Sequence, residues 1–206
     1  MNSIQLPVQI LPQRLVRQNL NVVYPVITAG TNPMALHKMN RQIYHLVESL
    51  ITEQGYYQSP QTVSVTGYFE IKNNQRGVLS ISIINYAFPE KAAHGLTIIK
   101  SLNFDIRTGI NYPLEYLFMP NSDYLSRLNS IIEKQIKERN IPMLGDFPGV
   151  SPRQDYYIAD KVLVIYYQLY ELAPYAYGFP QFPISVYQLQ DIIREDSLLG
   201  PMLANS

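Results

Sequence analysis

The 206-residue sequence contains no cysteine and no tryptophan, and it has only three histidines. Without cysteine the chain has no disulfide, no thiol nucleophile and no thiolate metal site. Basic and acidic side chains number 16 each, so the formal charge is zero and gives no net attraction to nucleic acid. No run of apolar residues is long enough for a transmembrane helix. We therefore expect neither a nucleic-acid partner nor a transmembrane segment.

The first twenty residues also lack the apolar core of a signal peptide, and they contain Pro7, Pro12, Arg14 and Arg17. We therefore expect synthesis in the cytoplasm, without export by an ordinary signal. The absence of cysteine leaves the final compartment open, because such a chain tolerates oxidising and reducing surroundings alike. The sequence leaves the oligomeric state open as well.

Tyrosine is the residue that the sequence has in excess, with 17 copies. Five of them lie between Tyr166 and Tyr177, in a stretch that continues through Gly178 to Pro180. The chain length predicts one domain or two small joined ones, and the hydrophobic fraction of 47% is typical of a globular protein.

Two segments show the three-and-four spacing of apolar residues that is typical of an amphipathic helix. The first begins after Asn32, a good N-cap residue, with Pro33 in its first turn and Gly55 at its end. The second follows residues 120–122 and has a charged outer face. The apolar positions of the two helices are Leu36, Met39, Ile43, Leu46, Val47 and Leu50, and Tyr124, Leu128, Ile131, Ile132 and Ile136.

Alternation of apolar and polar residues predicts strands in the middle of the chain, over residues 62–71, 79–83 and 96–106. We expect them to form an antiparallel meander with one buried face. An earlier strand is predicted near residues 15–27, and a final hairpin is predicted over 155–172. Ser185 and Gln188 have the spacing of a capping box, which predicts a short last helix.

Strands and helices occur in groups rather than in βαβ alternation, which favours the α+β class. We predict one antiparallel sheet, made of the meander and the C-terminal hairpin, with the two long helices packed on one face. A connector rich in proline and glycine divides two modules. The predicted parts are an N-terminal arm or edge segment over 1–20, an α+β module over 21–139, a C-terminal module on the same sheet over 140–196, and a flexible tail over 197–206.

None of the histidines belongs to a recognisable ligand set or catalytic motif. His37 and His45 are too far apart on the predicted helix to chelate one ion. His94 lies between small residues just before a strand, where its ring could either enter a cleft or fix a turn by hydrogen bonding. We expect no metal and no cofactor.

Glu171 and Asp155, on neighbouring strands of the last hairpin, are the best candidates for a pair of carboxylates. The alternative is a structural pair that accepts backbone hydrogen bonds. The sequence has no nucleophile elbow and no glycine-rich phosphate loop. We therefore do not predict an enzyme.

The tyrosine-rich stretch predicts a strand that leads into a loop containing Tyr170, Tyr175, Tyr177 and Phe179. Exposed tyrosines are efficient contact residues because a rigid amphipathic ring buries a large area at low entropic cost. The alternative is that these rings fill a core that lacks tryptophan. We expect half of the strand tyrosines in the core and the loop tyrosines at the surface.

The pattern Tyr-x-Leu-Tyr-Glu-Leu-Ala-Pro-Tyr-Ala-x-Gly-x-Pro over 167–180 resembles the C-terminal module of the RsiV-like family. These are extracytoplasmic regions of lysozyme-sensing anti-sigma factors, and the non-catalytic N-terminal region of a peptidoglycan deacetylase is similar. The preceding module of that family resembles residues 24–27, His94-Gly95 and the pattern Phe-Asp-x-x-Thr-Gly over 104–109. The resemblance implies a compact α+β unit that binds a partner at the cell envelope.

We therefore predict a non-enzymatic binding module of RsiV-like type, which recognises a lysozyme-like protein or a cell-envelope glycan through the aromatic loop. One alternative is a tyrosine-rich structural protein of a spore or envelope layer. Another is a glycan hydrolase with Glu171 and His94 as acid and base. The residues predicted to contact the partner are Tyr170, Glu171, Tyr175, Tyr177, Phe179 and His94.

Overall fold

The computed structural model describes residues 8–204 and divides into two compact units, with the boundary between Asn111 and Tyr112. The sequence predicted the boundary at 139/140 instead. The difference concerns helix α2 (Tyr124–Glu138), which belongs to the second unit. The two units are described separately below.

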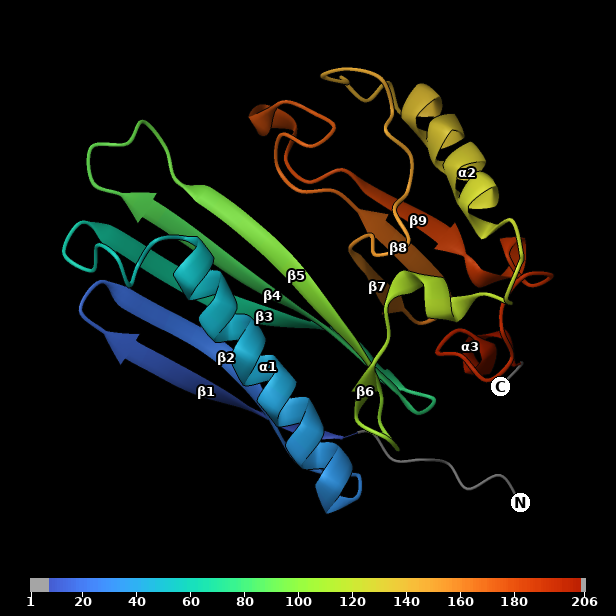
Figure 1. Ribbon diagram of the computed structural model, residues 1–206, viewed down its shortest axis with the longest axis horizontal. Coiled ribbons are helices and arrows are strands. Elements are labelled where there is room, and N and C mark those ends of the chain that lie inside the picture. Colours follow the sequence, from blue (N-terminus) through green and yellow to red (C-terminus); the bar gives the residue numbers. More distant parts are fainter. Residues whose placement is uncertain (1–7, 205–206) are drawn as a thin grey trace. The chain divides into compact units, whose positions relative to one another are not determined.

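The first unit is a six-stranded sheet with its strands in the order of the chain (Figure 1). Neighbouring strands are antiparallel, except that β2 and β3 pair in parallel over Leu20–Val22 and Val65–Gly67. The strand at one edge, β1, falls within the predicted edge segment. The strands are β1 (Gln9–Arg17), β2 (Leu20–Ala29), β3 (Val63–Gln75), β4 (Val78–Pro89), β5 (Leu96–Asp105) and β6 (Ile110–Asn111).

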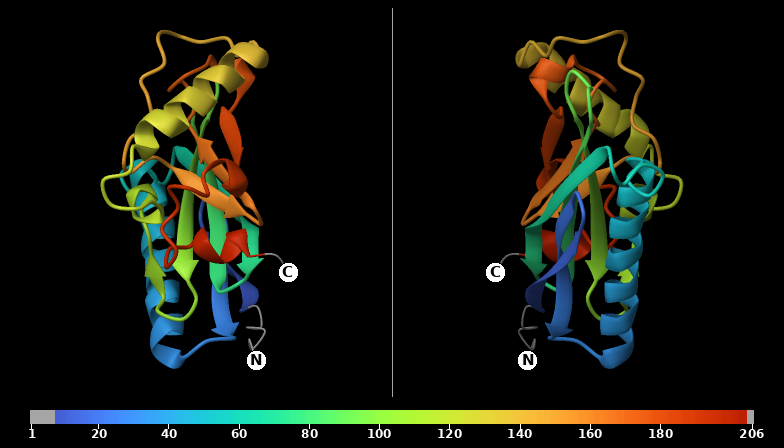
Figure 2. Two further views of the ribbon diagram at one scale, coloured as in Figure 1. Left: turned by 90° about the vertical axis from the view of Figure 1, so that its right-hand side faces the viewer. Right: turned by 90° about the vertical axis from the view of Figure 1, so that its left-hand side faces the viewer.

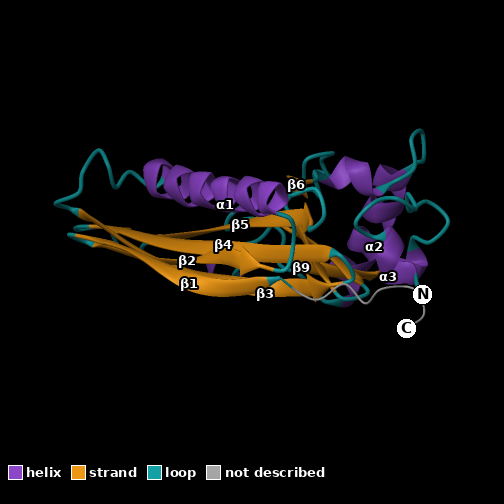
Figure 3. Ribbon diagram, turned by 90° about the horizontal axis from the view of Figure 1, so that it is seen from below, coloured by secondary structure: helices purple, strands orange, loops and turns teal. Residues whose placement is uncertain are grey.

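Helix α1 (Pro33–Glu53) runs along one face of this sheet (Figures 1 and 3). It begins as predicted, because the Oδ1 of Asn32 accepts a hydrogen bond from the Ala35 amide and Pro33 occupies the first turn. The apolar stripe of the helix is buried against β2, β4 and β5. Its fully buried side chains are Ala35, Met39, Ile43, Val47, Leu50 and Ile51.

Strand β4 is buried on both of its faces, whereas the sequence predicted one buried face. Its apolar residues, such as Ile81, lie on the α1 side, and Ser80 and Ser82 lie on the opposite side. Buried hydroxyls need hydrogen-bond partners. Ser80 donates to Asn103 at 2.6 Å, and the Ser82 hydroxyl lies 2.9 Å from that of Ser101.

The second unit has its own three-stranded antiparallel sheet, in the order β7-β8-β9. Side chains of α2 attach the helix to β9, since Gln135 donates to the Pro183 carbonyl and Arg139 donates to the Gln181 carbonyl. The elements are η1 (Leu114–Leu117), α2, β7 (Tyr156–Ala159), β8 (Val162–Tyr166), η2 (Tyr175–Tyr177), β9 (Gln181–Ser185), η3 (Val186–Gln188) and α3 (Gly200–Leu203).

These observations confirm the α+β class and correct its details. The prediction that the C-terminal hairpin joins the first sheet is wrong, because β7 and β8 pair with β9 in a separate sheet. The two long helices accordingly belong to different units, α1 with the six-stranded sheet and α2 with the three-stranded one (Figure 2). Apolar periodicity identified both helices, but it carries no information about which sheet a helix covers.

The C-terminal region also differs from the prediction. Ser185 makes no side-chain cap, and only a short 3-10 turn follows it. The segment predicted as a flexible tail is packed up to residue 204, with Leu199 and Met202 fully buried and the Ser197 hydroxyl bonded to the Leu117 carbonyl. Residues 205–206 of that tail, and residues 1–7 of the predicted arm, lie outside the described residues. Within 8–204, no helix combines the length and apolarity needed to cross a membrane.

Candidate functional site

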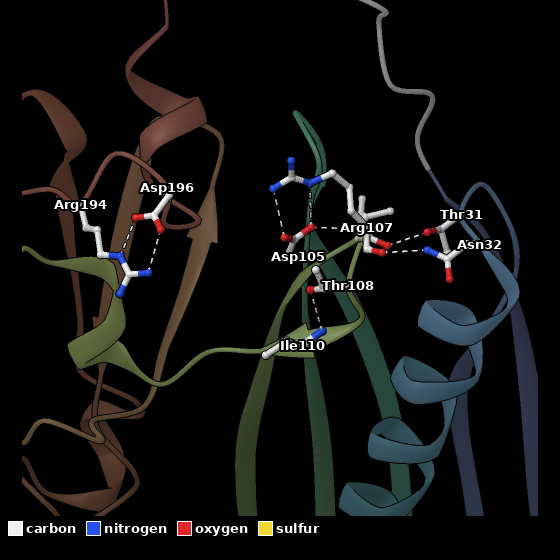
Figure 4. Close-up of polar contacts among 9 residues, drawn as sticks. Thr31, Asn32, Asp105, Arg107, Thr108, Ile110, Arg194 and Asp196 are labelled. Carbon is white, nitrogen blue, oxygen red and sulfur yellow. Dashed lines mark hydrogen bonds and ion pairs between the residues drawn. The ribbon is translucent and has the colours of Figure 1, made fainter.

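The Phe-Asp-x-x-Thr-Gly pattern forms the turn between β5 and β6, and this turn is bound to the start of α1 (Figure 4). Thr31 donates its hydroxyl proton to the Ile106 carbonyl at 2.6 Å. The side-chain amide of Asn32 donates to the Arg107 carbonyl at 2.8 Å. Asp105 organises the turn from within, because its Oδ1 accepts the Arg107 backbone N–H at 2.8 Å. The groups of this motif are therefore engaged in packing the helix on the sheet.

Gly109 explains why the pattern ends in glycine. Its φ of +68° lies in the left-handed region, and a Cβ added there would lie 2.5 Å from the Ala35 carbonyl oxygen. The side chain of Gln42 donates to the Gly109 carbonyl at 3.0 Å. A side chain at this position would push the turn away from α1. The motif marks a close backbone contact rather than a reactive group.

Gly95 has a similar role beside the candidate residue His94. A Cβ on Gly95 would lie 2.4 Å from both the Ala87 carbonyl oxygen and the ring of Tyr86. The glycine thus permits the segment to pack under an aromatic ring. His94 itself is exposed, with its Nδ1 3.0 Å from the Gly95 carbonyl. His94 belongs to the first unit, whereas the other five predicted contact residues belong to the second.

The tyrosines of the stretch 166–177 form a buried, a half-buried and an exposed set. Tyr166, at the end of β8, and Tyr167 are buried. The Tyr167 ring packs edge-on against Phe147 and Phe182, and its hydroxyl donates to the Gly149 carbonyl at 3.0 Å. Burial raises the pKa of the Tyr167 hydroxyl, and the nearby charge of Glu171 raises it further. Tyr167 is therefore a neutral core residue.

Tyr170 belongs to the exposed set and has an unusual backbone. Its φ is +67°, a region that costs a bulky residue free energy, and its side chain is 48% exposed. Its ring lies 5.7 Å from that of Tyr175, which is half-buried at the start of η2. The structure thus brings together two of the predicted contact residues as a pair of neighbouring rings.

Tyr177 and Phe179 are half-buried. Since Tyr175 is half-buried as well, the expectation that the loop tyrosines lie at the surface is met fully only at Tyr170. Arg139, at the end of α2, lies 3.3 Å from the Tyr177 hydroxyl and packs over the Phe182 ring at 5.5 Å. This arginine anchors the far end of the aromatic loop, by which we mean residues 167–180. The loop is therefore fixed at Tyr167 and Tyr177, with Tyr170 exposed between them.

The two candidate carboxylates are joined by one residue. Gln168 donates its backbone N–H to Glu171 at 2.5 Å and its side-chain amide to Asp155 at 2.9 Å. These bonds are of the structural kind that the sequence left as the alternative. Glu171 nevertheless keeps one oxygen, Oε1, that accepts no hydrogen bond from the residues of 8–204.

An open pocket of about 320 Å³ lies beside the aromatic loop, within the second unit. We call it the Glu171 pocket. The sequence did not predict it, because residues 148–151 read as a connector rich in proline and glycine. The positive φ of Gly149 (+84°) turns this connector toward Tyr167. The residues that line the pocket are Pro148, Gly149, Val150, Ser151, Gln154, Tyr167 and Glu171.

The remaining histidines, His37 and His45, are exposed on α1. In the part of the chain that the structure describes, no three histidine, aspartate or glutamate residues are grouped so that they could hold a metal ion.

The fold of the chain is shared with solved structures. A DUF3298 family protein from Pseudomonas aeruginosa PAO1 is 15% identical and superposes with a TM-score of 0.71, over 98% of each chain. A member of the same family from Bacteroides fragilis NCTC 9343 is also 15% identical, with a TM-score of 0.63 over the full length of both chains. At this identity the likeness shows the fold alone.

The amino-acid sequence also matches a known family over part of its length. Residues 115–187 match the family described as a protein of unknown function (DUF3298). The matched region contains the Glu171 pocket and the whole aromatic loop. No curated protein matches the chain.

Proposed function

We propose that the second unit is a non-enzymatic binding module, which recognises a lysozyme-like protein or a cell-envelope glycan through the aromatic loop. The observation that carries this proposal is Tyr170, which is 48% exposed and has a φ of +67°. Backbone strain at an exposed aromatic residue is a feature of sites in which a side chain is positioned for contact.

The physical argument concerns preorganisation. A side chain in a binding site loses conformational freedom when a partner arrives, and fixing it beforehand reduces that loss. Tyr170 is fixed in advance by its neighbours, since Tyr175 packs on its ring and Glu171 caps the turn through the Gln168 amide. Such a ring can stack on a sugar or fill a depression on a protein without reordering the loop.

The choice of partner is supported by the resemblance of residues 167–180 to the RsiV-like family. Members of that family include receptors that capture lysozyme, and the resembling segment contains both Tyr170 and Tyr175. A lysozyme-like protein and a peptidoglycan fragment are therefore the first ligands to examine.

The test is a calorimetric titration of the whole chain with lysozyme and with peptidoglycan fragments. We expect one of them to bind and Tyr170→Ala to weaken that binding at least about tenfold, as for a central aromatic contact. Tyr116→Ala is the matched control, because Tyr116 is equally exposed (48%) and lies in the same unit outside the loop. The proposal is contradicted if neither ligand binds. It is also contradicted if a ligand binds with equal affinity to the wild type, Tyr170→Ala and Tyr175→Ala.

A further inference from the structure

The Glu171 pocket has an unusual balance of charge. Of the seven residues that line it, Glu171 alone carries a charge at neutral pH, and no lysine or arginine is among them. The ion pairs formed within the described part of the second unit join other residues, namely Arg127 with Asp191, Lys134 with Glu138, and Arg194 with Asp196. The pocket is therefore locally acidic, although the chain as a whole is neutral.

The hydrogen-bonding groups of the pocket are also unbalanced. The Tyr167 hydroxyl donates to the Gly149 carbonyl, and the side-chain amide of Gln154 donates to the Tyr166 carbonyl at 3.0 Å. Both of these donors are thus engaged within the protein. The Ser151 hydroxyl, which accepts the Arg153 backbone N–H at 3.3 Å, is the remaining side-chain donor of the lining. Glu171 Oε1 remains available as an acceptor, and the Tyr167 oxygen keeps its lone pairs. A ligand for this pocket should be rich in donors and should carry a positive charge.

The size and surroundings of the pocket agree with such a ligand. A volume of about 320 Å³ is at the lower end of the range for small-ligand sites. This is sufficient for the end of one long side chain rather than for an oligosaccharide. Tyr167 lines the pocket, and aromatic rings attract cations through their π faces.

We infer that the Glu171 pocket binds the cationic end of a lysine or arginine side chain presented by a protein partner. The inference rests on the proposed function, since it specifies the chemistry of the partner that contacts the aromatic loop. The inference favours a basic protein over a neutral glycan, because the hydroxyl groups of a glycan cannot neutralise the charge of Glu171. The carboxylate would accept the ammonium or guanidinium protons directly.

The first experiment uses small probes on the whole chain and follows the backbone amides of Gly149 and Gln168 by NMR. Nα-acetyl-arginine amide and Nα-acetyl-lysine amide should shift these signals in a saturable way that weakens as salt is added. Nα-acetyl-citrulline amide has nearly the shape of the arginine probe without its charge, and it should leave the signals unmoved. Equal shifts with the citrulline and arginine probes, or no shift with any probe, overturn the inference.

The second experiment changes the carboxylate. Glu171→Gln retains an oxygen that can accept the Gln168 N–H, so the loop should keep its conformation while the charge is lost. We expect the cationic probes to bind at least about tenfold more weakly, which corresponds to the loss of a hydrogen bond to a charged group. Glu133→Gln is the control, since Glu133 is exposed on α2 in the same unit. Equal affinity of Glu171→Gln and wild type overturns the inference.

The two proposals fail in different ways. If Tyr170→Ala abolishes binding of the large ligand while the charged probes never bind, the inference about the pocket is wrong and the binding module stands. If the probes bind in a Glu171-dependent manner while lysozyme and peptidoglycan fragments are silent, the pocket stands and the proposed partner is wrong.

Discussion

Two patterned turns, one in each unit, use their residues in opposite ways. In the β5–β6 turn of the first unit, the carbonyls of Ile106, Arg107 and Gly109 accept hydrogen bonds from side chains just before α1 and in its first half. In the aromatic loop of the second unit, the turn around Tyr170 is strained and Tyr170 is 48% exposed. The first turn directs its bonding groups inward, and the second turn displays a side chain.

This difference distinguishes two reasons why a turn can carry a recognisable sequence pattern. A turn whose polar groups are all bonded within the fold serves packing, and its glycine is required by close contact. A turn that keeps a bulky residue at positive φ bears a cost in stability that its own packing does not explain. Such a turn is the better place to look for a binding role.

The largest expected effect tests the packing side of this comparison. Gly109→Ala should lower the free energy of unfolding by about 3 kcal/mol, because the new Cβ combines an unfavourable φ with overlap of the Ala35 backbone. Urea denaturation followed by circular dichroism measures the loss. Gly55→Ala is the control, since Gly55 has a φ of +80° and nothing within 4 Å of an added Cβ, and it should lose only about 1 kcal/mol. Equal losses in the two variants would show that the close contact is unimportant.

A smaller effect tests the strain in the aromatic loop. Tyr170→Gly and Tyr170→Ala both remove the ring, but glycine tolerates the φ of +67° and alanine does not. We expect the glycine variant to be more stable by about 1 kcal/mol, with binding lost equally in both. At Tyr116, in the helical turn η1, the order should reverse, because glycine is unfavourable in a helix. An alanine variant at position 170 as stable as the glycine variant would contradict the idea of strain.

The smallest effect concerns charge in the β5–β6 turn. The Arg107 side chain pairs with Asp105 at 3.2 Å but is 70% exposed, so the pair should contribute about 0.5 kcal/mol or less. Arg107→Ala keeps the backbone N–H that Asp105 accepts, and it should leave the urea midpoint almost unchanged at low and high salt. A loss as large as that of Gly109→Ala would mean that the ion pair, rather than the backbone contact, holds the turn.

The sequence predicts features that depend on neighbouring residues. The start of α1 follows from Asn32 and Pro33, and its buried stripe follows from the spacing of apolar side chains. The aromatic loop could be located for the same reason, since the tyrosines are close together in the chain. Tyr167 and Tyr170 nevertheless look alike in sequence, and only their surroundings make one buried and the other exposed.

Features that depend on distant residues could not be predicted. The Glu171 pocket forms because the Gly149 carbonyl meets the Tyr167 hydroxyl, and no local signal pairs these residues. The boundary between Asn111 and Tyr112 could not be predicted for a similar reason. The connector at 140–153 has the composition of a domain boundary, but it lies within the second unit. Composition shows where a chain turns, and only tertiary contacts show where a unit ends.

The parallel pairing of β2 and β3 has a consequence for how the first unit assembles. Strands β1 and β2, and likewise β3, β4 and β5, are joined by short connections, so each group can form from residues near one another in the chain. Bringing β2 beside β3 requires the chain to close a long loop, which is the slower kind of step in folding. Helix α1 spans that loop, and its formation shortens the distance to be searched. We therefore expect the docking of α1 to join two hairpin groups that form earlier.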